Sequence, residues 1–156
     1  GACTVALIGQ GADGKPHYQA VNSCLIPIGA ISGRQIVTVE GLANGALHPV
    51  QAAMVQTGGS QCGYCTPGFI MSLFAAYYDG KVDDICVEGN LCRCTGYVPI
   101  RRAASLVTGT ATPDAFSHRL AQATIALSEI DYRTAQHHFY RPTQLSKLLE
   151  LLQQHP

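Results

Sequence analysis

Two closely spaced pairs of cysteines carry the chemistry that this sequence indicates most clearly. Cys62 and Cys65 form a C-x2-C pair within QCGYCTPG, and Cys92 and Cys94 form a C-x-C pair within GNLCRCTGY. Because roughly one helical hairpin separates the two pairs, we expect the folded chain to bring the four thiols together. Four thiolates suit an iron–sulfur cluster or a structural zinc ion.

The residues around these cysteines favour the iron–sulfur cluster. Structural zinc sites usually combine two C-x2-C knuckles on polar turns, or mix Cys with His. Here one pair is C-x-C, the flanking segments are apolar and no His lies near. Cys65 also directly precedes Thr66-Pro67, a predicted helix start whose free N–H groups would favour an anionic cluster. A zinc-stabilised interaction module without enzymatic activity and a set of reduced core cysteines are the alternatives.

Composition argues against several other classes of function. Ten Lys and Arg residues balance ten Asp and Glu residues, so nothing steers the chain toward nucleic acid or an anionic membrane. A hydrophobic share of 47% with only 13% charged residues indicates surfaces covered by other domains or subunits. The longest apolar run, 69–78, is too short to span a bilayer. Without a recognisable signal peptide, and with seven cysteines at metal-like spacings, we expect a reducing, cytoplasmic compartment.

The hydrophobic pattern predicts strands first and helices later. Strands are predicted over 4–8, 17–21 and 35–39, and helices over 49–58, 66–79, 82–87 and 99–107. Between the second and third strands, 22–28 around Cys24 is expected to form a short buried turn or helical stretch. The helix 66–79, with Thr66 as its N-cap, lacks a polar face and should be central and buried. Helices flank each cysteine pair, which predicts a four-helix arrangement in two similar halves.

The C-terminal third predicts a linker and then a new unit. Residues 109–136, including Thr110–Asp114, are interpreted as a linker with a surface helix near 118–130. A strand is predicted over 138–142. Thr143 is expected to cap an amphipathic helix whose apolar positions are Leu145, Leu148, Leu149 and Leu152.

The segments QCGYCTPGFIMSLFAAYY and GNLCRCTGYVPIRRAA resemble the iron–sulfur part of the xanthine dehydrogenase family of molybdenum hydroxylases. That family also includes aldehyde oxidoreductases and carbon monoxide dehydrogenases. The resemblance covers essentially the whole chain and implies an α+β fold, truncated at both ends. It divides the chain into a partial β-grasp ferredoxin of plant type over 1–43, a helical 2Fe-2S domain over 44–108, the linker 109–136, and the start of an FAD-binding domain over 137–156.

The resemblance also implies roles for individual residues. The ligands of the cluster nearest the molybdenum cofactor would be Cys62, Cys65, Cys92 and Cys94. Gln61 and Cys94 would approach the pterin of that cofactor, which a partner subunit or domain binds. The opening GACTV resembles the end of the C-x4-C-x2-C run of plant-type ferredoxins. Cys3 and Cys24 would therefore be two ligands of a second 2Fe-2S cluster, which this chain alone leaves incomplete.

These assignments imply an oxidoreductase component that relays electrons from the molybdenum cofactor toward FAD and NAD+ during purine hydroxylation. No residue here is assigned to substrate chemistry, which would belong to the molybdenum-binding partner. The segment 138–152 resembles the start of the flavin domain and favours the xanthine dehydrogenase type. The same relay in an aldehyde, carbon monoxide or other heterocycle hydroxylase, and a nonfunctional fragment, are the alternatives. The segment 82–89 is slightly shorter than in the family, which leaves the packing of the predicted third helix open.

Overall fold

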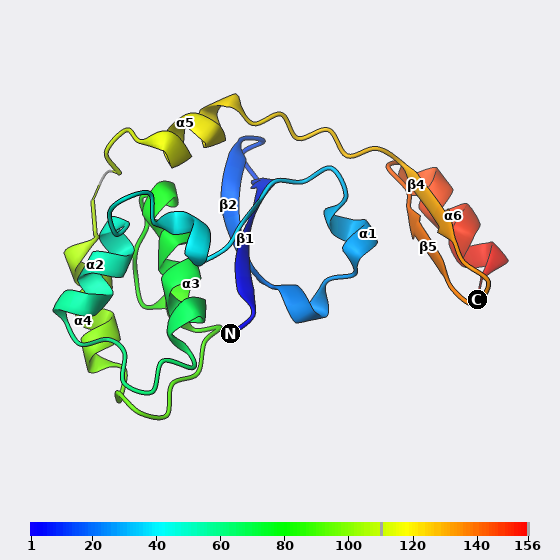
Figure 1. Ribbon diagram of the computed structural model, residues 1–156. Helices are drawn as coiled ribbons and strands as arrows, with labels where there is room; N and C mark the ends of the chain where they lie inside the picture. Colours follow the sequence, from blue (N-terminus) through cyan, green and yellow to red (C-terminus); the bar gives the residue numbers. More distant parts are fainter. Residues whose placement is uncertain (110, 156) are drawn as a thin grey trace.

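The computed structural model describes residues 1–109 and 111–155 and shows a mixed α/β chain (Figure 1). The strands are β1 (Thr4–Gln10), β2 (Pro16–Asn22), β3 (Ile36–Val37), β4 (Ile130–Arg133) and β5 (His138–Arg141). The helices are α1 (Ile28–Ile31), α2 (Pro49–Gln56), α3 (Thr66–Asp79), α4 (Val98–Leu106), α5 (Ala115–Gln122) and α6 (Leu145–Gln154). Single 3₁₀ turns form at Ser23–Leu25, Glu40–Leu42 and Ile85–Val87. None of the described helices is long and apolar enough to cross a membrane.

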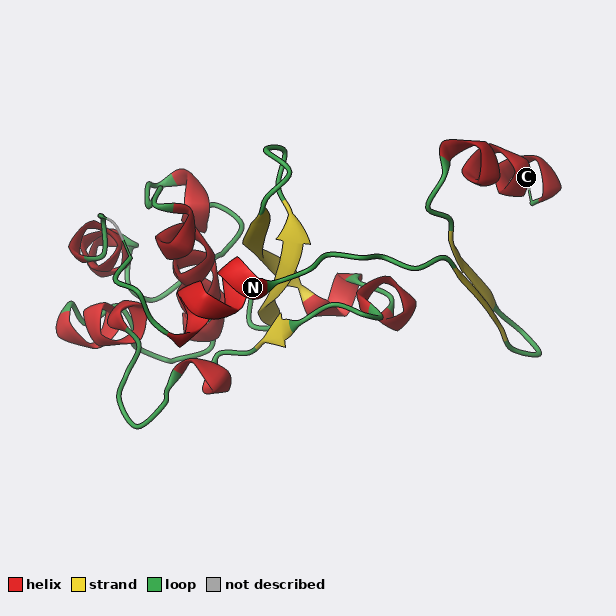
Figure 2. Cartoon of the chain, turned by 90° about the horizontal axis from the view of Figure 1, so that it is seen from above, coloured by secondary structure: helices red, strands yellow, loops and turns green. Residues whose placement is uncertain are grey.

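A small antiparallel sheet separates the helices into two groups. Its strand order is β2-β1-β3, with Ala6 of β1 opposite Ala20 on one side and Val37 on the other. Helices α2, α3 and α4 lie on one side of this sheet and α1 lies on the other (Figures 1 and 2). The linker then leads to a separate hairpin of β4 and β5, followed by α6.

Helix α3 is the centre of the hydrophobic core, as its sequence predicted. Phe69, Leu73 and Phe74 are fully buried, and ten of the helix's residues are buried in all. The Phe74 ring lies 4.8 Å from the ring centroid of Tyr18 on β2. Gly80 ends the helix with φ +68°, a conformation that glycine adopts without steric cost. Burial on all sides is what a helix without a polar face requires.

The start of α3 and the predicted helix over 82–87 differ from the sequence prediction. Cys65, not Thr66, is the N-cap residue, and the Thr66 hydroxyl instead donates to Ser60 Oγ at 2.7 Å. The predicted helix is only a 3₁₀ turn, because the Asp83 carboxylate accepts the N–H groups of Ile85 and Cys86 at 3.0 and 3.1 Å. Such local side-chain bonds compete with helix formation. Within the described residues of 44–108 there are thus three α-helices and one 3₁₀ turn, not four helices.

The turn around Cys24 and the third strand also depart from prediction. Cys24 is exposed, as is Leu25, at 76%, so this turn is not buried. β3 has only two residues, because beyond Val37 the chain leaves the sheet and enters the 3₁₀ turn at Glu40–Leu42. The apolar pattern over 35–39 did not show where this pairing would stop.

The linker is anchored to the core through α5. This helix begins at Ala115, earlier than predicted, because the Asp114 carboxylate caps it by accepting the N–H groups of Phe116 and Ser117 at 3.0 and 2.8 Å. Tyr78 of α3 donates its hydroxyl to the same carboxylate and contacts the buried His48 at 3.0 Å. The predicted linker includes Thr110, which lies outside the described residues. The rest of 109–136 contains both α5 and β4.

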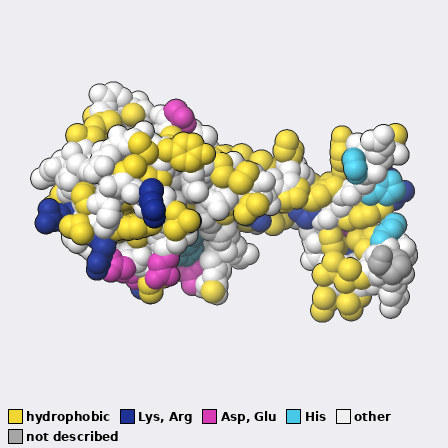
Figure 3. All heavy atoms as spheres, turned by 90° about the horizontal axis from the view of Figure 1, so that it is seen from below, with side chains coloured by type: hydrophobic (Ala, Val, Ile, Leu, Met, Phe, Trp, Pro, Cys, Tyr) yellow, Lys and Arg dark blue, Asp and Glu magenta, His cyan; other side chains and the backbone are white. Residues whose placement is uncertain are grey.

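The C-terminal unit is a hairpin followed by a helix. Residues 138–141 form the predicted strand, and β4, which the sequence analysis missed, pairs with it, placing Ile130 opposite Arg141. Gln144 rather than Thr143 precedes the final helix, with no side-chain cap. Its four predicted apolar leucines are exposed, between 41% and 71%. Apolar side chains also reach the surface elsewhere on the face that Figure 3 shows.

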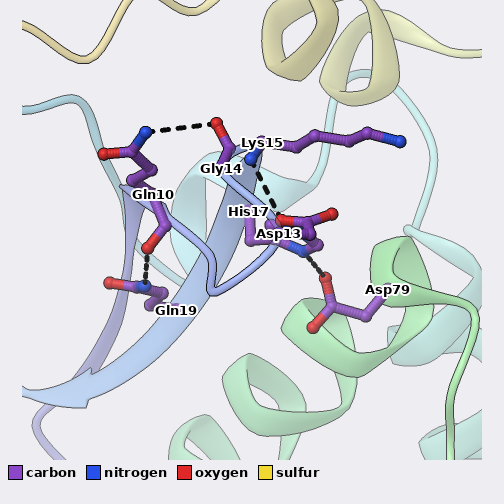
Figure 4. Close-up of polar contacts among 7 residues, drawn as sticks. All are labelled: Gln10, Asp13, Gly14, Lys15, His17, Gln19 and Asp79. Carbon is purple, nitrogen blue, oxygen red and sulfur yellow. Dashed lines mark hydrogen bonds and ion pairs between the residues drawn. The ribbon is translucent and has the colours of Figure 1, made fainter.

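An ion pair fastens the β1–β2 turn to the end of α3 (Figure 4). His17 Nδ1 lies 2.7 Å from Asp79 Oδ1, and His17 Nε2 lies 2.9 Å from Asp13 Oδ1. The Lys15 N–H also donates to Asp13 at 3.0 Å. The hydrogen bonds to Asp79 and then to Asp13 raise the pKa of His17 above its ordinary value. A carboxylate faces each ring nitrogen, so the doubly protonated imidazolium is the form that this arrangement favours.

This ion pair makes a pH-dependent contribution to stability. Because the pKa of His17 is raised on folding, its contribution is fully present below about pH 6.5 and is lost as the pH rises through the folded-state value. We expect the urea midpoint of the wild type to exceed that of His17→Gln at about pH 6, with the gap narrowing toward about pH 9. A gap that stays constant over this range would show that His17 does not titrate with folding.

Candidate metal centre

The first cysteine pair lies on a tight loop between α2 and α3. Gly63 in this loop has φ +84°, which favours glycine, and the Thr66 N–H donates to its carbonyl at 3.2 Å. The hydrogen bond between Thr66 and Ser60 closes the loop from the other end. Cys62 is exposed and Cys65 is half-buried at the N-terminus of α3. These hydrogen bonds therefore fix the loop that carries both thiols.

The second pair lies on the loop between the 3₁₀ turn at Ile85–Val87 and α4, which Tyr97 holds in place. Tyr97 is the one non-glycine residue with positive φ, +67°, among those the structure describes. Its hydroxyl accepts the Cys92 N–H at 3.0 Å, and its ring meets that of Phe69 edge-on at 6.1 Å. Its own N–H donates to the Thr95 hydroxyl at 3.2 Å. Tyr97 therefore links the C-x-C loop to α3.

The two loops bring the four predicted thiols together in two pairs. Cys62 faces Cys94 and Cys65 faces Cys92, and in each pair the two thiols lie close enough to shift each other's pKa. A 2Fe-2S cluster takes two thiolates on each of its two irons. The donor set of two facing thiol pairs therefore fits a two-iron cluster.

Hydrogen-bond donors already point at these sulfurs. The Thr95 hydroxyl lies 3.1 Å from Cys92 Sγ and its N–H 3.5 Å away, and together they lower the pKa of Cys92 to about 7. The backbone N–H of Tyr64 lowers the pKa of Cys62 as well. Burial chiefly raises the pKa of Cys65 to about 11. Thiolates are the metal-binding form, and such donors tune a bound cluster.

Cys3 and Cys24 also lie together, where β1 begins and β2 ends. Their sulfurs are 3.2 Å apart, and the Ser23 N–H donates to the Cys3 carbonyl at 3.2 Å. The backbone N–H of Cys24 lowers the pKa of Cys3, whereas donation to Cys3 raises the pKa of Cys24. Two adjacent thiols are what one iron of a cluster would take. The assignment of both residues as ligands remains a prediction.

The other predicted site residues lie at the surface or outside these pairs. Gln61 and Cys94 are exposed. Arg93, between the ligands of the second loop, is exposed too. Cys86 is half-buried and donates to the Asp83 carbonyl at 2.9 Å. It is the one cysteine without a cysteine partner here.

Three residues that support the site were missed in the sequence analysis. Thr95 and Tyr97 hold the C-x-C loop, and the buried Asn90 donates its Nδ2 to Ser72 Oγ at 2.8 Å, fixing the start of that loop on α3. An aromatic residue after Gly96 was the available signal for Tyr97. Nothing in the local pattern distinguished Asn90 from an ordinary turn residue.

Removing the Tyr97 hydroxyl tests its role in the loop. Tyr97→Phe keeps the ring against Phe69 but leaves the Cys92 N–H without its acceptor, which costs about 1 kcal/mol. We expect the cluster to form but to be lost roughly fivefold faster to a chelator, as followed by visible absorbance. Tyr64→Phe, on the exposed first loop, is the matched control and should match the wild type. Equal loss rates for the wild type and Tyr97→Phe would contradict this role.

Comparison with known proteins adds the class of this domain. The pattern of the 2Fe-2S binding domain family matches residues 38–105, which contain both facing cysteine pairs. Xanthine dehydrogenase 1 from Arabidopsis thaliana is 44% identical over 110 residues, which are 64% of this chain and 8% of that protein. Xanthine dehydrogenase from Blastobotrys adeninivorans is 43% identical over 113 residues, or 67% of this chain and 8% of the relative. The chain thus spans less than a tenth of these curated relatives.

Two solved structures share the arrangement. Aldehyde oxidoreductase from Desulfovibrio gigas superposes with a TM-score of 0.58 at 36% identity, covering 69% of this chain and 12% of that chain. Quinoline 2-oxidoreductase from Pseudomonas putida 86 gives a TM-score of 0.55 at 26% identity, covering 79% and 70%. The chain therefore carries a 2Fe-2S binding domain. The region is similar to the corresponding part of these xanthine dehydrogenases, at 43–44% identity.

Proposed function

We propose that this chain is the electron-transfer portion of a xanthine dehydrogenase-like molybdenum hydroxylase. It would relay electrons from the molybdenum cofactor toward FAD and NAD+ during purine hydroxylation. The observation that carries the proposal is the facing of two thiol pairs, Cys62 with Cys94 and Cys65 with Cys92, inside a matched 2Fe-2S domain. A 2Fe-2S cluster held there would supply reversible one-electron storage.

The chain's own residues would bind and insulate that cluster. The four thiolates would hold it, the Thr95 and Tyr64 N–H groups would donate to its ligand sulfurs, and Phe69 and Tyr97 would exclude water beneath it. No residue in this chain is proposed to act on substrate. That chemistry would belong to the partner subunit or domain that binds the molybdenum cofactor.

The finer domain division is part of the same proposal. Residues 1–43 would be the ferredoxin remnant of β-grasp type, in which Cys3 and Cys24 supply two ligands of a second cluster. Residues 44–108 would be the helical cluster domain, 109–136 the linker, and 137–156 the start of the FAD-binding domain. The 3.2 Å approach of Cys3 to Cys24 beside the sheet supports the first of these assignments.

The proposed partners follow from what the two cysteine regions expose. Gln61 and Cys94 lie at the surface, so the pterin of a molybdenum-binding partner can reach both. All seven cysteines are free, in keeping with a reducing compartment such as the cytoplasm. The balance of charges supports neither nucleic acid nor membrane as a partner.

Anaerobic reduction by candidate substrates tests the proposal. The chain, assembled with its molybdenum-containing partner, is mixed with xanthine, an aldehyde or quinoline, and cluster reduction is followed by EPR spectroscopy. We expect xanthine to reduce the cluster fastest. Faster reduction by the aldehyde or quinoline would instead assign the relay to another hydroxylase, a candidate that the similarity to the two solved structures favours. No reduction by any of them would contradict the relay.

A further inference from the structure

The β4–β5 hairpin touches the rest of the chain at α1, the short helix that follows the Cys24 turn (Figure 1). Arg141, the last residue of β5, makes this contact. Its Nη1 donates to the carbonyl of Ser32 at 2.8 Å, and to those of Gly29 and Ala30 at 3.3 and 3.5 Å. These carbonyls lie at the C-terminal end of α1, where helical carbonyls lack partners and a cation is favoured.

The other half of the Arg141 guanidinium holds the incoming linker. Its Nε donates to the Ser128 carbonyl at 3.0 Å, and its Nη2 lies 3.4 Å from Ser128 Oγ. One side chain therefore joins the end of the linker, the hairpin and α1. Only the planar, multi-donor guanidinium of arginine reaches all of these acceptors at once, so lysine would not replace it.

Phe139 adds an apolar contact beside this polar one. A Cβ atom placed on Gly29 would lie 2.4 Å from the Phe139 ring, so the aromatic ring occupies the space that a side chain would need. Around this contact, a cavity of about 530 Å³ is lined by residues from α1 and the hairpin, including Ile28, Tyr132 and His138. The hairpin therefore contacts α1 through one aromatic ring as well as through hydrogen bonds, beside an open cavity.

We propose that Arg141 is a positioning residue that docks the hairpin on α1 and so holds the start of the flavin domain against the loop that follows Cys24. This inference rests on the proposed function, because a short distance between the flavin domain and the Cys24 loop matters only if electrons pass between them. Electron transfer slows steeply with distance. Because α1 begins at Ile28, shortly after the Cys24 turn, a flavin domain anchored on α1 would stay close to the second cluster.

The docking is tested in the full chain by amide hydrogen exchange. Arg141→Ala is expected to raise exchange over residues 28–34 and 138–141 about tenfold or more, because it removes charge-assisted bonds, and to leave α3 unchanged. Arg133→Ala is the matched control, since Arg133 pairs with Asp131 inside the same hairpin and should leave 28–34 unaffected. Gly29→Ala places a methyl group where the Phe139 ring lies, so it should also raise exchange over residues 28–34 and 138–141. Exchange in Arg141→Ala equal to that of the wild type would overturn the proposal.

The assembled enzyme separates positioning from simple stabilisation. There, Arg141→Ala should slow flavin reduction while the rate at which the substrate first reduces the enzyme stays unchanged. Increased exchange with unaltered flavin reduction would overturn the positioning role. Iron is measured in every sample. If the chain holds no iron but Arg141→Ala still raises exchange, the relay function is refuted while the docking of the hairpin on α1 is supported.

Discussion

Replacing Cys92 with serine is expected to abolish the cluster of the helical region. The alkoxide of serine is a far weaker ligand than a thiolate, and the Thr95 hydroxyl and N–H lower the pKa of Cys92 to about 7. Because the site closes on four ligands, losing one leaves the cluster without a complete ligand set. We expect iron and acid-labile sulfide to fall to background, with Cys62→Ser giving the same result.

Cys86→Ser is the matched control for this experiment. Cys86 lies between the same two loops in sequence but donates to the Asp83 carbonyl, a bond that a serine hydroxyl can also make. Its iron content should equal that of the wild type. If Cys92→Ser kept its iron, or Cys86→Ser lost it, the ligand assignment would be wrong.

Phe74→Ala is expected to give the largest loss of stability outside the metal centre. The ring is fully buried in α3 and meets Tyr18, His48 and Phe116 at centroid distances of 4.8, 5.2 and 5.2 Å. Deleting it removes buried apolar surface and leaves a cavity among aromatic rings that α3 shares with the sheet and α5. The free energy of unfolding should fall by about 3–5 kcal/mol, as measured by urea denaturation.

Val55→Ala, on the exposed face of α2, serves as the comparison for that loss. Val55 is 72% exposed, so its truncation should change the free energy of unfolding by no more than about 0.5 kcal/mol. A loss in Phe74→Ala as small as that in Val55→Ala would mean that the core around α3 is not packed as described.

The central helix and the metal centre could be predicted from sequence because local and global signals agree there. Helix α3 carries a run of apolar residues between a proline start and Gly80, and it spans the predicted 66–79. The spacing of the cysteine pairs also indicated that their thiols would meet. Tyr97 could not be placed in the same way, because its left-handed backbone and its bond to Cys92 depend on a tertiary contact with Phe69.

The remaining misses have similar physical causes. The predicted helix over 82–87 failed because Asp83 captures two N–H groups, an effect of side-chain geometry rather than of hydrophobic period. β4 was missed because its residues are largely exposed and therefore show little alternation, and its pairing with β5 decides its conformation. The burial of the Cys24 turn was predicted from its apolar residues, but those side chains remain at the surface.

The metal that the full chain binds is the most direct test of the electron relay. Iron, zinc and acid-labile sulfide should be measured per chain after anaerobic expression, with an EPR spectrum of the dithionite-reduced protein. We predict about two irons and about two sulfides, with one signal of a reduced 2Fe-2S cluster and negligible zinc. Stoichiometric zinc without iron or sulfide would contradict the electron relay and make this chain a zinc-stabilised structural module.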